Sequence, residues 1–84
     1  MRFADVRALR TEIAAVTAEM VSKRLDPQSV VVTQEQARAL VMVEGAEELR
    51  VAGRRLLVVS ELEVGQPLPD GMFQVLEGIP EVRS

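Results

Sequence analysis

The chain has 84 residues, a formal net charge of −3 at pH 7, and no Cys, His, Trp or Tyr. We expect a single domain at this length, and the missing Cys excludes disulfides and thiolate metal sites. The charge gives no basic footprint for nucleic acid, and no apolar run approaches the ~20 residues of a membrane helix. The first residues carry charges throughout and lack the apolar region of a signal peptide, so we expect a cytoplasmic protein.

Residues 1–25 are predicted to form one amphipathic helix, because they contain no Pro or Gly and are rich in good helix formers. The helix should end near Asp26, since Pro27 disfavours helical geometry in the residue before it. Apolar side chains recur along it at spacings of three and four and form one stripe: Val6, Leu9, Ile13, Val16 and Met20. Two interpretations are open. The stripe packs on the protein's own sheet, or it forms a helix–helix seam in a homodimer.

The next segment predicts a short strand followed by a short helix. Residues 29–33 are a β-branched run typical of a strand. Thr33 followed by Gln36 matches a capping box, in which each side chain satisfies an amide of the first helical turn. We therefore expect a helix over residues 34–44, although the apolar letters ALVMV within it also suit a strand.

Residues 48–77 are predicted to form antiparallel strands. Residues 48–51 and 55–64 form a hairpin around Ala52-Gly53, and residues 72–77 form the last strand after a Pro-Asp-Gly turn. Residues 78–84 form a surface tail. The predicted fold is α+β, with a long amino-terminal amphipathic helix packed on a three- or four-stranded antiparallel sheet and a second short helix.

The stretch RRLLVVSELEV, residues 54–64, is apolar on both faces of the predicted strand. If one face covers the core, the other presents Leu57 and Val59, together with either Met72 and Leu76 or Phe73 and Val75 of the last strand. Soluble monomers rarely keep such a patch bare. Three covers are possible: the helix at residues 34–44, a second copy of the chain, or a different protein.

The sequence contains few residue types that could act in catalysis. Acid–base work would depend on carboxylates, and only a convergent pocket of Glu48, Glu61 and Glu63 would favour an enzyme. Charges on a solvated strand face explain these residues more simply. Arg54 and Arg55 flank the turn as solubilising charges, or act as interface contacts, a role in which Arg is enriched. We predict no enzyme, no cofactor and no metal site.

The run VAGRRLLVVSELEVGQPLPDGMFQVLE, residues 51–77, resembles strand–turn–strand stretches of small tailed-phage structural and accessory proteins. The resemblance implies assembly or binding to a host protein, without a cofactor, in the host cytoplasm or the virion. We predict a protein–protein interaction or assembly module that forms homo-oligomers, with a dimer expected; nucleic acid and membrane are not expected partners. The alternative is a small inhibitor or adaptor of a larger protein. The predicted interface residues are Val6, Leu9, Ile13, Val16, Met20, Arg54, Arg55, Leu57, Val59, Met72 and Leu76.

Overall fold

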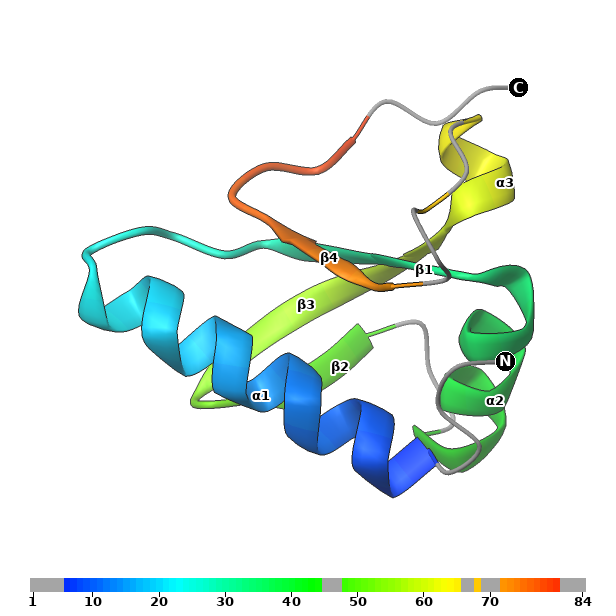
Figure 1. The fold of residues 1–84 in the computed structure, drawn as a ribbon, viewed down its shortest axis with the longest axis horizontal. Helices are drawn as coiled ribbons and strands as arrows, with labels where there is room; N and C mark the ends of the chain where they lie inside the picture. The colour runs from blue at the N-terminus through cyan, green and yellow to red at the C-terminus, as the bar shows by residue number, and fades with distance from the viewer. Residues whose placement is uncertain (1–5, 45–47, 66–67, 69–71, 81–84) are drawn as a thin grey trace.

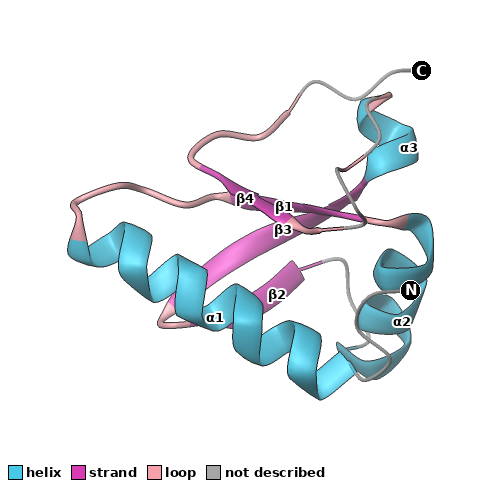
Figure 2. Cartoon of the chain, in the orientation of Figure 1, coloured by secondary structure: helices cyan, strands magenta, loops and turns pink. Residues whose placement is uncertain are grey.

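A computed structural model describes residues 6–44, 48–65, 68 and 72–80. The fold is α+β, with two helices on one side of a four-stranded sheet (Figures 1 and 2). The elements, in chain order, are α1 (Val6–Ser22), β1 (Ser29–Val32), α2 (Gln34–Glu44), β2 (Glu48–Val51), β3 (Arg54–Ser60), α3 (Glu61–Val64) and β4 (Gln74–Leu76). Among the described residues, no helix has the length and apolar character to cross a membrane. The predicted turn at residues 69–71 and the end of the tail, 81–84, lie outside the described residues.

The sheet has the order β2-β3-β1-β4 and is mixed, so the prediction of a fully antiparallel sheet is wrong at one pair of strands. β1 runs parallel to β3, with Val30 opposite Val58, whereas β4 and β2 are antiparallel to their neighbours. A parallel pair needs a long crossover connection, which α2 and β2 supply between β1 and β3. All four residues of β1 are buried, as is typical of a central strand covered on both faces.

The core lies between α1, α2 and the sheet. Its buried members are Leu9, Ile13, Val30, Val32, Leu40, Leu49, Val51, Leu56 and Val58. Thr17 continues the buried side of α1 beyond Ile13, and its hydroxyl donates to the Ile13 carbonyl at 2.7 Å. The α1 stripe therefore packs on the protein's own sheet. The buried positions 9, 13 and 17 are spaced by four, which leaves Val16 and Met20 only half-buried.

The end of α1 is a Schellman motif in which Arg24 occupies the left-handed position, with φ of 64°. The Leu25 amide donates to the Met20 carbonyl at 2.9 Å, and the Arg24 amide donates to the Val21 carbonyl at 3.0 Å. This position normally holds Gly, because a Cβ there is strained.

Replacing Arg24 with Gly is therefore expected to raise the free energy of unfolding by about 1 kcal/mol, since the strain of the left-handed backbone disappears. Urea unfolding followed by circular dichroism measures the change. Arg24→Ala is the control, because it removes the same side chain but keeps a Cβ, and it should stay close to the parent protein. Equal stability of the Gly and Ala variants would contradict the prediction.

The predicted capping box of α2 is confirmed. The Gln36 amide donates to Thr33 Oγ1 at 3.1 Å, and the Thr33 amide donates to Gln36 Oε1 at 3.0 Å. The hairpin turn at Ala52-Gly53 is also confirmed, and both residues have positive φ, as a type I′ turn requires.

The prediction that the strand after this turn continues to Val64 is wrong. β3 ends at Ser60, whose Oγ accepts from the Glu63 amide at 3.2 Å and so caps the single turn α3. Gly65 closes this turn in a left-handed conformation, with φ of 80°. The last strand is also shorter than predicted, because β4 covers only residues 74–76.

The second face of the sheet is covered at its centre by the chain itself. Val31 and Val59 are 3% and 1% exposed. α3 lies at the end of β3 and contacts β1 and β3 (Figure 1). Ser29 Oγ donates to the Gly78 carbonyl. α2 lies with α1 on the opposite side, where its Leu40 joins the core, so it is not the cover of this face. Of the patch predicted to be bare, Leu57 and Leu76 are half-buried, and Met72 is 38% exposed.

Candidate interaction groove

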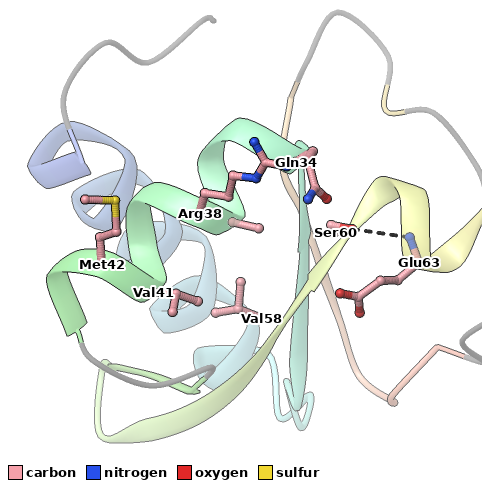
Figure 3. A pocket seen from close by; sticks show the side chains of 8 residues that line it. Gln34, Arg38, Val41, Met42, Val58, Ser60 and Glu63 are labelled. Carbon is pink, nitrogen blue, oxygen red and sulfur yellow. Dashed lines mark hydrogen bonds between the residues drawn. The ribbon is translucent and has the colours of Figure 1, made fainter.

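An open groove of about 380 Å³ lies between α2 and the end of β3 with α3 (Figure 3). Its lining residues are Gln34, Ala37, Arg38, Val41 and Met42 from α2, Val58 and Ser60 from β3, and Glu63 from α3. The groove combines four apolar side chains with four polar or charged ones, a composition compatible with a binding site.

Local periodicity places these side chains together. Along α2, the lining residues after Gln34 follow it by three, four and seven positions, at Ala37, Arg38 and Val41. The four side chains therefore share one side of the helix. Val58 and Ser60 are two residues apart on β3 and point to the same face of the sheet. Val58 forms the floor and is 7% exposed. In Figure 3, Val41 and Val58 point toward each other across the groove.

Met42 is the most exposed apolar side chain of the groove, at 85%. Val41 beside it is 36% exposed, and Leu62 on α3 next to Glu63 is 68% exposed. Fully burying a Met or Leu side chain stabilises by about 1.5–3 kcal/mol, so covering this surface would be favourable. The two most exposed large apolar side chains of the described residues therefore lie on α2 and α3, and the next, Ile79, is 59% exposed after β4.

The groove also has opposite charges on its two walls. Arg38 stands on the α2 wall and Glu63 on the α3 wall (Figure 3). Neither side chain makes an ion pair or hydrogen bond with another described residue. Both charges are thus free to meet a partner whose charges are arranged in the opposite order.

None of the predicted interface residues is among the described residues that line this groove. Three of them, Leu9, Ile13 and Val59, are buried inside the chain and are not available to a partner. The prediction that these three residues form an interface is therefore wrong. Arg54 is paired with Asp26, with 2.9 Å between Nη1 and Oδ1. The other predicted residues are half-buried or exposed: Val6, Val16, Met20, Leu57 and Leu76 are half-buried, and Arg55 and Met72 are exposed.

A sequence signal for the groove existed in residues 40–43, which read Leu-Val-Met-Val. Four consecutive apolar residues cannot all face one side of a helix, because successive side chains are about 100° apart. Leu40 faces the core, so Val41 and Met42 must lie toward or beyond the edge of the packed side.

The three carboxylates that would have favoured an enzyme do not form a common pocket. Glu63 lines the groove, Glu61 Oε2 accepts from the Leu68 amide at 2.8 Å, and Glu48 lies on β2. Within the described residues, no group of three or more potential ligands could hold a metal ion. The absence of enzymatic activity stays a prediction.

Comparison with protein-family models, curated proteins and solved structures gives no match for this chain. The resemblance to small tailed-phage proteins consequently stays a prediction, and the function must be argued from the groove itself.

Proposed function

We propose that this chain is a non-enzymatic interaction module that self-associates as a homodimer through the α2 groove. The observation that supports this proposal is Met42, an apolar side chain 85% exposed at the margin of an apolar groove. A side chain in this setting stabilises the protein most when another molecule removes it from water.

A second copy of the chain suits the groove because the groove is self-complementary. A two-fold dimer uses the same surface on both subunits, so each surface must offer what the other needs. Here the surface holds a protruding Met42, an apolar floor at Val58, and opposite charges at Arg38 and Glu63. Antiparallel contact of the two α2 helices brings the Met42 of one copy to the groove of the other, and Arg38 of one copy toward Glu63 of the other.

Sedimentation velocity over a concentration series tests the proposal. The parent protein should be a dimer, and Met42→Glu should raise the dimer dissociation constant by about 10-fold or more, because a charge is placed in the buried contact. Ile79→Glu is the matched control: Ile79 is also exposed, at 59%, but does not line the groove, and this variant should dimerise like the parent protein.

A charge exchange adds a test of the geometry. Arg38→Glu should weaken the dimer, and Glu63→Arg in the same chain should restore it, since the opposite pairs between copies are re-formed. A parent protein that remains a monomer at all concentrations would overturn self-association. It would favour the alternative, an adaptor or inhibitor whose groove receives a larger protein.

A further inference from the structure

The side chain on which the proposed dimer depends most, Met42, also carries a sulfur atom that can be oxidised. Met42 lies at the end of the α2 groove remote from Glu63 (Figure 3). It is 85% exposed, whereas Met72 is 38% exposed and Met20 is half-buried. Of these three thioethers, an oxidant in solution therefore reaches that of Met42 most easily.

We infer that Met42 is an oxidation site for peroxides and that its oxidation to the sulfoxide opens the dimer. This inference rests on the proposed function, since it concerns the control of the same groove. With hydrogen peroxide, a sulfur lone pair attacks one peroxide oxygen, the O–O bond breaks and an S–O bond forms. The proton of the transferred oxygen passes to the other oxygen, which leaves as water. Sulfur loses two electrons and the peroxide gains them.

The sulfoxide is unfavourable in the dimer because it turns an apolar side chain into a polar acceptor. The apolar lining of the groove, at Ala37, Val41 and Val58, has no side-chain donor for its oxygen. Burying a polar group without a hydrogen bond costs free energy. The nearest cation on the same helix is Arg38, one turn before Met42. A bond from Arg38 to the sulfoxide would take this guanidinium away from Glu63 of the other copy, so it would weaken the dimer as well.

Dimer formation and oxidation compete for the same side chain. Met42 is exposed in the free subunit, and contact with a second copy removes it from solvent. Peroxide therefore reacts with the free subunit, and the oxidised subunit is withdrawn from the dimerisation equilibrium. As a result, the rate of Met42 oxidation should fall as the protein concentration rises through the dimer dissociation constant, whereas the rate at Met72, which does not line the groove, should stay constant.

Sedimentation velocity of the full chain before and after treatment with hydrogen peroxide tests the inference. Peptide mass spectrometry measures the sulfoxide at each methionine, and circular dichroism verifies that the oxidised protein remains folded. Oxidation of Met42 should raise the dimer dissociation constant by about 10-fold or more. Methionine sulfoxide reductases of both epimer specificities, supplied with dithiothreitol as the reductant, should restore the original dissociation constant.

Two leucine variants assign the effect to one sulfur. Met42→Leu keeps an apolar side chain but forms no sulfoxide at this position, so its own dissociation constant should be the same before and after peroxide. Met72→Leu is the matched control, because it removes a thioether outside the groove, and peroxide should weaken its dimer as it weakens the parent's.

The results separate this inference from the proposed function. A parent dimer in which peroxide leaves Met42 unmodified, or whose dissociation constant stays the same once Met42 is oxidised, overturns the inference and leaves the dimer intact. An equal response of Met42→Leu and the parent protein to peroxide does the same. A parent protein that is a monomer at all concentrations overturns the proposed function and this inference together.

Discussion

Replacing Ile13 with Ala is expected to lower the free energy of unfolding by about 2–5 kcal/mol, the largest effect of any substitution considered for this chain. Ile13 is fully buried on the side of α1 that faces the sheet, and it belongs to the single cluster formed by α1, α2 and the strands. Its truncation removes buried methylene and methyl groups and leaves a cavity that the surrounding strands can fill only in part. Domains of this size have stabilities of roughly 4–12 kcal/mol, so a substantial part would be lost.

Urea unfolding followed by circular dichroism measures this change, and two further variants calibrate it. Ile13→Val removes one methylene and should cost about 0.5–1.5 kcal/mol. Met42→Ala truncates an apolar side chain that is 85% exposed and should change the free energy of unfolding of the subunit by less than about 0.5 kcal/mol. Because dimer formation adds to apparent stability, the three variants are compared at one protein concentration. An Ile13→Ala protein within about 1 kcal/mol of the parent would contradict the assignment of Ile13 to the core.

The elements predicted well from sequence are those decided by local rules. The spacing of Leu9 and Ile13 predicted one apolar side of α1, which the structure packs on the sheet. The pair Thr33 and Gln36 marked the start of α2 at the residue where the structure has it. The hairpin between β2 and β3 follows from the two-residue turn at Ala52-Gly53. Each of these depends on interactions within a few residues along the chain.

The helical turn α3 was missed although its local signal was present. Ser60 followed three residues later by Glu63 matches the same capping pattern as Thr33 and Gln36. The alternation of Glu61, Leu62, Glu63 and Val64 has period two, and this favoured a continuing strand. The hydroxyl of Ser60 decides the outcome, because it accepts the Glu63 amide and ends the strand.

The sheet pairing and the groove could not be derived from local rules. The parallel pairing of β1 with β3 joins segments separated by α2 and β2, and nothing in either strand specifies the direction of its partner. The groove depends on how far α2 covers Val58, which is a matter of helix placement. The burial of Val59 on the second face was also missed, because the sequence did not indicate that α3 would contact β1 or that Gly78 would accept a hydrogen bond from Ser29.

Gln36→Leu is expected to destabilise the protein by about 1–3 kcal/mol, although leucine has nearly the volume of glutamine. Gln36 is fully buried at the start of α2, and its Oε1 accepts the Thr33 amide at 3.0 Å. Leucine keeps the packing but removes this acceptor, so the Thr33 amide loses its partner in a part-buried position. A buried donor that is left without its acceptor costs more free energy than an average hydrogen bond contributes to stability.

Thr33→Ala provides the complementary measurement. It removes the hydroxyl that accepts the Gln36 amide and should cost about 0.5–2 kcal/mol, the usual range for a helix N-cap. Because both bonds fix the same first turn of α2, the double variant should lose less stability than the sum of the two single variants. Hydrogen exchange at the Thr33 amide adds a local readout, since its protection should fall in Gln36→Leu. Unchanged protection together with a neutral effect on unfolding would show that the reciprocal pair does not stabilise the start of α2.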